Sequence, residues 1–344
     1  MGRESVTWCG IYFEVKDKAE AGKLSSDLIF GLNLFFMARS NVSIYAALAS
    51  NVAIAIAKFI AGSFTKSSAM ISEAVHSLVD CINELLLLLG IYRSNKERDK
   101  KHPFGYGREL YFWSFIVAIL IFGLGSGVSI YQGISKLKNP VPTTNLKWNY
   151  FVLAFALVCE GISFWIALKN FNKTRGDQSL WDAIINSKDP STFMVLLEDG
   201  GAVIGIMIVA ICLTLERIFR NPYIDSIASL LVGLLLFFIS IILARESRSL
   251  LMGEGISQKT EKSIVQIVKS NSTVIDVKRF FSLYESPDEV LIVLVVSFRE
   301  NLNTNDISEA IVSIKGEIRK QFPKINFILI QPVADGLQPD NFSG

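Results

Sequence analysis

The chain has 344 residues, of which 51% are hydrophobic and 19% are charged, and its formal net charge is +2. This composition excludes an ordinary soluble protein, and the small net charge excludes a large nucleic-acid-binding surface. We therefore expect a multi-pass α-helical membrane protein.

Residues 1–41 precede the first apolar run and are interpreted as an N-terminal cytosolic or interfacial segment. Between 24 and 40, apolar and polar positions mix around Asn33 and Arg39, which favours an interfacial helix over a seventh membrane span. The segment lacks the pattern of a cleaved signal peptide.

Six apolar runs follow within residues 42–250, each long enough to cross a bilayer at roughly 20 residues per span. They lie at about 43–62, 67–92, 109–135, 149–170, 190–216 and 223–244. The connectors after the second and fourth runs are the most basic, so these connectors and both termini are predicted to be cytoplasmic. The sequence leaves the membrane itself open; in a bacterium it would be the cell membrane.

Residues 251–335 have the composition of a soluble domain, and residues 336–344 form a tail. The pattern predicts the order αββαβ, with helices over 258–270 and 304–322 and strands over 274–284, 289–298 and 325–331. This order is typical of a small cytosolic α+β domain with two helices on one face of a three-stranded sheet. The domain contains neither His nor Cys.

The second apolar run carries a polar stripe formed by Glu73, His76, Asp80 and Glu84. His76 and Asp80 are four residues apart, so both side chains lie on one face of a helix at the spacing of metal ligands. Charge inside a bilayer is costly, and we therefore interpret the pair as functional. The alternative is a pair of helices joined by buried hydrogen bonds.

The fifth run contributes Glu198 and Asp199, adjacent residues whose side chains diverge by about 100° around a helix. Only one of them can face the pair in the second run. Gly200, Gly201 and Gly205 permit a close approach between the two helices. Asp199 is our first choice for a shared metal centre, and Glu198 is the reserve.

Glu160, in the middle of the fourth run, is a third intramembrane acid. Three roles fit it: a metal ligand, a proton carrier, or the partner of a polar group on a neighbouring helix.

An imidazole and carboxylates around one ion suit zinc, although manganese, ferrous iron and cobalt accept the same ligands. These ligands bind metal only when deprotonated, so metal entry releases protons. We therefore predict proton coupling through His76, Asp80 and Asp199, with the metal as cargo and without a resident cofactor.

Two motifs resemble those of the cation diffusion facilitators: Ser-Glu-Ala-Val-His-Ser-Leu-Val-Asp at 72–80 and His-Pro-Phe-Gly-Tyr-Gly at 102–107. The resemblance covers about 42–333, and Leu-Leu-Glu-Asp at 196–199 and Asn-Pro-Tyr-Ile-Asp-Ser at 221–226 look most like the zinc transporter 9 subgroup. It implies a homodimeric secondary transporter that exchanges divalent metal for protons, with the C-terminal domain serving dimerisation.

In that family, the transport site takes two residues from span two and two from span five, each pair four residues apart. His76, Asp80 and Asp199 match three of these positions, but the fourth is Val195. Water, Glu198 or Glu160 would then complete the site.

Some relatives have a further metal site in the connector after span two. Asp99 and His102 match two of its ligands, whereas the third position is Tyr106 here. An exposed His in a loop is otherwise simply solvated.

The predicted function is export of a divalent cation from the cytoplasm in exchange for protons by alternating access. Zinc is the first candidate for this cation. The rivals are a transporter selective for manganese, iron or cobalt, and a non-transporting regulatory membrane protein with a degenerate metal site. An enzyme is not expected, because the His-Glu-x-x-His motif and a nucleophile arrangement are lacking. Expected partners are the metal, protons, membrane lipid and a second copy of the chain.

Overall fold

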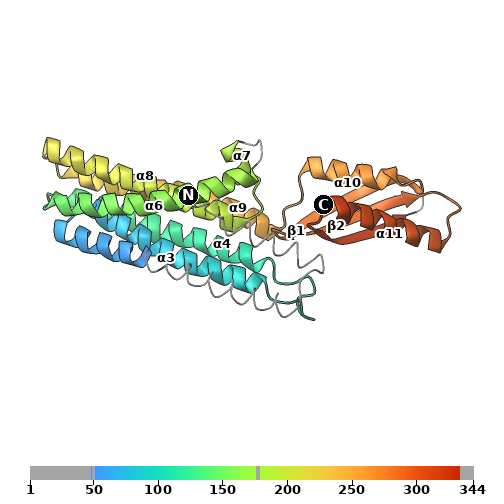
Figure 1. Cartoon of the computed structure of the whole chain (residues 1–344). Coiled ribbons are helices and arrows are strands. Elements are labelled where there is room, and N and C mark those ends of the chain that lie inside the picture. Colours follow the sequence, from blue (N-terminus) through green and yellow to red (C-terminus); the bar gives the residue numbers. More distant parts are fainter. Residues whose placement is uncertain (1–47, 49–50, 176–178, 334–344) are drawn as a thin grey trace, which may run out of the picture. The chain divides into compact units, whose positions relative to one another are not determined.

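The computed structural model describes residues 48, 51–175 and 179–333 (Figure 1). The chain divides into two compact units, residues 1–53 and 54–344, and the described residues of the first unit are helical. The segment 1–41, with its predicted interfacial helix, and the tail 336–344 lie outside the described residues.

Five helices in the described part of the chain are long and apolar enough to cross a membrane. They cover Ser68–Ser94, Glu109–Lys138, Leu146–Lys173, Pro190–Phe219 and Tyr223–Met252. A shorter apolar helix covers Asn51–Thr65, and most of the first predicted span before it lies outside the described residues.

The helices are labelled as in Figure 1. In chain order they are α3 (Ser68–Ser94), α4 (Glu109–Leu120), the π-helical segment η1 (Ile121–Ser126), α5 (Gly127–Lys138), α6 (Leu146–Thr174), α7 (Leu180–Ile185), α8 (Pro190–Phe219) and α9 (Tyr223–Met252). Helices α4, η1 and α5 follow one another without a break and make one long apolar helix.

Short polar signals fix where several helices begin and end. The Ser67 side chain accepts a hydrogen bond from the Met70 amide and caps α3, and Asp189 caps α8 in the same way ahead of Pro190. Helix α9 continues to Met252, beyond the predicted end at 244, because its first backbone stop is Gly253, whose φ is 103°. Hydropathy marks the last apolar residue of a span, whereas the helix ends where the backbone leaves the helical conformation, here at Gly253.

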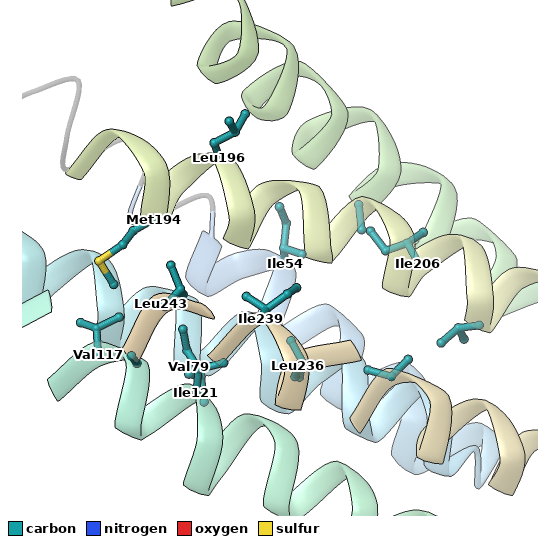
Figure 2. Close-up of a cluster of buried hydrophobic side chains, with 14 of the residues drawn as sticks. Ile54, Val79, Val117, Ile121, Met194, Leu196, Ile206, Leu236, Ile239 and Leu243 are labelled. Carbon is teal, nitrogen blue, oxygen red and sulfur yellow. The ribbon is translucent and has the colours of Figure 1, made fainter. Parts of the chain in front are cut away.

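Buried apolar side chains join the long helices (Figure 2). The side chains labelled there come from the Asn51–Thr65 helix, α3, α4, η1, α8 and α9 and include Ile54, Val79, Val117, Ile206 and Leu236. Helix α6 is the most exposed of the five long helices, and its large apolar side chains, such as Phe151 and Trp165, point outward. An apolar outer surface is what a helix facing lipid requires.

The C-terminal domain contains α10 (Gln258–Ser270), β1 (Val274–Ser286), β2 (Glu289–Phe298), α11 (Thr304–Gln321) and β3 (Ile325–Val333). Strand β2 is central, antiparallel to β1 and parallel to β3, and α11 provides the crossover. Both helices bury an apolar face in the core of this domain, together with alternate residues of β2. Strands β1 and β3 each run slightly past their predicted ends at 284 and 331.

Candidate metal centre

The polar stripe of α3 lies inside the helix bundle. Glu73 and His76 are buried, and the Asp80 side chain is 18% exposed. His76 Nδ1 lies 3.3 Å from Asp80 Oδ1, but the two atoms lack the alignment of a hydrogen bond. Among the described residues, His76 Nε2 and Asp80 Oδ1 are therefore buried polar atoms without a hydrogen-bond partner. Such atoms are costly unless a ligand satisfies them.

The two acids of α8 face different helices, as their adjacent positions predict. Asn83 Nδ2 on α3 donates a hydrogen bond of 3.1 Å to Glu198 Oε1, whereas Ser163 Oγ on α6 donates one of 2.6 Å to Asp199 Oδ2. The Asp80 carboxylate lies within electrostatic range of both acids. The reserve ligand is thus the one directed toward α3.

Gly200, Gly201 and Gly205 of α8, which we expected to allow a close approach to α3, lie against three different neighbours. A Cβ atom on Gly200 would meet Phe164 of α6, and one on Gly201 would meet Ile239 of α9. Only Gly205 faces α3, where an added Cβ would lie 2.4 Å from Glu73 Oε1. At Gly205 the backbone of α8 therefore lies close to the Glu73 side chain of α3.

One charged residue of this region, Lys58, was missed by the sequence reasoning. It is fully buried on the Asn51–Thr65 helix, and its Nζ lies 3.2 Å from Glu73 Oε2 and donates to Ser77 Oγ at 2.8 Å. The signal was present in the sequence, because a single basic residue interrupts the apolar run between Ile54 and Ala61. An ionisable residue inside a span is a functional candidate whatever its sign.

Glu160 of α6 has the same Lys58 as its partner. Its Oε1 accepts a hydrogen bond of 3.4 Å from Lys58 Nζ, and its side chain is 14% exposed. Of the three roles that fit Glu160, the pairing with a polar group on a neighbouring helix is the geometry seen in the structure.

In residues 51–175 and 179–333, no three His, Cys, Asp or Glu side chains converge closely enough to enclose a metal ion. His76 and Asp80 form a close pair, while Asp199, Glu198 and Glu160 are each hydrogen-bonded elsewhere. Val195, at the position of the missing His, is 37% exposed. A complete coordination shell would thus require movement of α6 or α8 side chains toward α3.

The loop residues Asp99, His102 and Tyr106 make a separate, exposed cluster. The Tyr106 hydroxyl donates to Asp99 Oδ2 at 2.7 Å, and the backbone amides of Lys101 and His102 donate to Oδ1. These hydrogen bonds, that from Tyr106 first, lower the pKa of Asp99 to about 2, and the same contact raises the pKa of Tyr106. The loop itself satisfies the Asp99 carboxylate.

Asp225, in the first turn of α9, is also buried. Its carboxylate accepts hydrogen bonds from the Ser68 amide and hydroxyl, both at 2.7 Å, and from Lys136 Nζ at 2.6 Å. Asp225 therefore satisfies the N-terminus of α3. This network fixes the end of the helix that carries His76 and Asp80.

Known proteins are similar to this chain mainly over its membrane domain. Residues 44–252 match the family model described as the cation efflux transmembrane domain. The mitochondrial proton-coupled zinc antiporter SLC30A9 of Mus musculus is 37% identical over 219 residues, which are 63% of this chain and 39% of that protein. The human protein of the same name matches equally well. The matched region therefore spans well under half the length of these relatives.

Two further relatives carry other names. Metal tolerance protein C4 of Arabidopsis thaliana is 33% identical over 229 residues, 66% of this chain and 49% of that protein. The manganese efflux system protein MneP of Bacillus subtilis is 25% identical over 285 residues, 83% of this chain and 92% of that protein.

Among solved structures, the nickel form of a variant of the MamM C-terminal domain matches with a TM-score of 0.22 and 10% identity. The match covers 23% of this chain and 98% of that domain.

Proposed function

The chain belongs to the cation efflux family, the cation diffusion facilitators, and on that basis we propose that it exchanges a divalent cation, zinc first, for protons across its membrane. The observation that carries the proposal is the pair of buried, unpartnered atoms His76 Nε2 and Asp80 Oδ1. A nitrogen and an oxygen without hydrogen-bond partners, on one helix face inside a membrane domain, are suited to hold a cation once both are deprotonated.

Completion of the site is the second step of the proposal. Asp199 occupies the matching position of span five, and Glu198 is directed toward α3 by Asn83. Either acid, or Glu160, would add the oxygen ligands that His76 and Asp80 lack. Since Asp80 already interacts electrostatically with all three, a cation at Asp80 would attract each of them.

Proton coupling follows from the ligand chemistry. His76, Asp80 and Asp199 must be deprotonated when metal is bound, and they accept protons when metal leaves. Alternate binding of metal and protons at one site makes the transporter an exchanger, provided that the site faces each side of the membrane in turn.

The wider architecture is part of the same proposal. We infer six membrane spans, the first of which includes the Asn51–Thr65 helix, with both termini in the cytoplasm. The C-terminal domain would join two copies of the chain into a homodimer. Its lack of His and Cys favours dimerisation over metal binding as its role.

Manganese is the second candidate substrate, because every candidate ligand except His76 supplies oxygen. An oxygen-rich site suits manganese better than a site with two imidazoles. The relative from Bacillus subtilis is named as a manganese efflux protein, whereas those from mouse and human are named as zinc antiporters. A regulatory protein that binds metal without moving it remains the rival from another class.

Reconstitution in liposomes with an imposed pH gradient tests the proposal. We expect zinc flux, opposite proton flux detected by a trapped pH dye, and loss of both in Asp80→Ala. Competition by manganese, iron and cobalt ranks the substrates. If the wild type binds zinc but moves none of the four metals, the regulatory rival is correct.

A further inference from the structure

The Lys58 ammonium lies beside the candidate metal centre. The proposed exchange of metal for protons gives this residue no role. The ammonium is fully buried and contacts the α3 side chains Glu73 and Ser77 on either side of His76 in sequence. A buried ion pair seldom repays its desolvation, so its presence inside a membrane domain points to a role other than stability.

The three contacts of the ammonium are unequal. Ser77 Oγ, at 2.8 Å, and Glu73 Oε2, at 3.2 Å, both belong to α3 and both are buried. Glu160 Oε1 is the most distant partner, at 3.4 Å, and belongs to α6, the most exposed long helix. The ammonium is therefore anchored on α3, and Glu160 is the partner that can leave.

Glu73 is held in place from its other side. Its Oε2 contacts Lys58, while its Oε1 lies against Gly205 of α8 and has no hydrogen-bond partner among the described residues. A Cβ atom at 205 would lie 2.4 Å from Oε1, so the Glu73 carboxylate lies close against the backbone of α8. Glu73, at 3.2 Å, is the nearer of the two carboxylate partners of the ammonium.

Lys58 and a metal ion would compete for the same carboxylate. Asp80 interacts electrostatically with both Glu160 and Lys58. A divalent cation held at His76 and Asp80 would repel the ammonium and attract Glu160. The competition needs no proton transfer, because the ammonium keeps Glu73 and Ser77 when Glu160 departs.

We propose that Lys58 is a positioning residue that holds Glu160 away from the metal centre, and that an incoming divalent cation takes Glu160 from it as the ligand absent at Val195. The inference rests on the proposed function. It assigns Lys58 the task of keeping metal affinity low enough for release on the far side of the membrane.

Two variants that shift zinc affinity in opposite directions test this. Glu73→Gln leaves Glu160 as the main counter-ion of Lys58, so Glu160 is held more firmly and the zinc KM rises roughly tenfold. The double change Lys58→Met with Glu73→Gln removes the buried pair together and frees Glu160, so the KM falls by a similar factor. Adding Glu160→Gln to each background abolishes the difference between them.

A merely structural ion pair predicts a different result. Loss of packing would lower the maximal rate in both variants and leave their zinc KM equal or shifted in the same direction, and that outcome would overturn the inference.

Equilibrium dialysis of zinc against the same variants in detergent separates this inference from the proposed function. The expected order of affinity is the double variant, then wild type, then Glu73→Gln. This order is measurable even if wild type moves no zinc, a result that would refute transport alone. If the three proteins bind zinc equally, Lys58 has no positioning role.

Discussion

Two His–Asp pairs of this protein have the same separation and different surroundings. His76 Nδ1 lies 3.3 Å from Asp80 Oδ1 inside the helix bundle, and His102 Nδ1 lies 3.3 Å from Asp99 Oδ1 in an exposed loop. In the loop, backbone amides and a tyrosine saturate the carboxylate. In the bundle, His76 Nε2 and Asp80 Oδ1 are left without partners within the described residues.

A short His–Asp distance alone therefore does not identify a metal site. What matters is whether lone pairs remain after the protein has satisfied its own donors and acceptors. Within the described residues, the buried pair keeps two polar atoms without partners, whereas the carboxylate of the exposed pair accepts hydrogen bonds from its own loop.

Matched alanine substitutions of the two aspartates should give the largest contrast. Asp80→Ala removes a ligand of the proposed cation. Loss of a residue that merely supports a metal ligand costs up to about 100-fold, so we expect loss of the ligand itself to lower zinc flux into proteoliposomes by at least that factor. Asp99→Ala, the control, should keep flux within about twofold of wild type, since surface changes away from special features are small. Equal loss of flux in both variants would contradict the distinction drawn between the pairs.

Matched glutamine substitutions of the two histidines should alter selectivity. His76→Gln replaces the one nitrogen ligand by an amide, so the ratio of zinc to manganese transport should fall roughly tenfold, because imidazole favours zinc and oxygen ligands favour manganese. The same change at His102 should leave the ratio unaltered. Competition between the two metals in one vesicle preparation measures it. An unchanged ratio in His76→Gln would remove His76 from the site.

The close contact between Gly205 and Glu73 can be tested by adding a methyl group at position 205. Gly205→Ala places a Cβ atom 2.4 Å from Glu73 Oε1, so we expect a loss of about 1–3 kcal/mol in the free energy of unfolding, the usual cost of overpacking. Gly161→Ala is the control, because an added Cβ there meets nothing within 4 Å. Thermal unfolding in detergent compares the two. A Gly205→Ala variant as stable as the control would show that Glu73 is free to move.

The smallest expected effect concerns the loop. Hydrogen bonds hold the pKa of Asp99 at about 2, below the ordinary value of 3.8, so the folded loop is stabilised above about pH 4 and this stabilisation is lost as the pH falls toward 2. Tyr106→Phe removes the largest contribution, and the pKa of Asp99 should rise toward its ordinary value. Titration of selectively labelled aspartate by NMR measures the shift. Flux should be unchanged, and a pKa that stays at about 2 would assign the effect to the backbone donors alone.

Much of the fold could be predicted because its signals are local. Hydropathy located the long helices, and β-branched apolar runs located the strands of the C-terminal domain. The predicted C-terminal end of α9 was wrong, because Arg245, Glu246 and Arg248 ended the apolar pattern without ending the helix. The short helix α7 was missed, although Ser179 accepts from the Asp182 amide as an N-cap.

A spacing of four residues places His76 and Asp80 on one face of any α-helix, so this relation could be read from the amino-acid order. The divergence of the adjacent residues Glu198 and Asp199 could be read in the same way. The packing of the helices, by contrast, sets which acid turns toward α3, the pairing of Glu160 with Lys58, and the contact between Gly205 and Glu73. These relations depend on how each helix is rotated against its neighbours, and that rotation is set by packing between residues far apart in the chain.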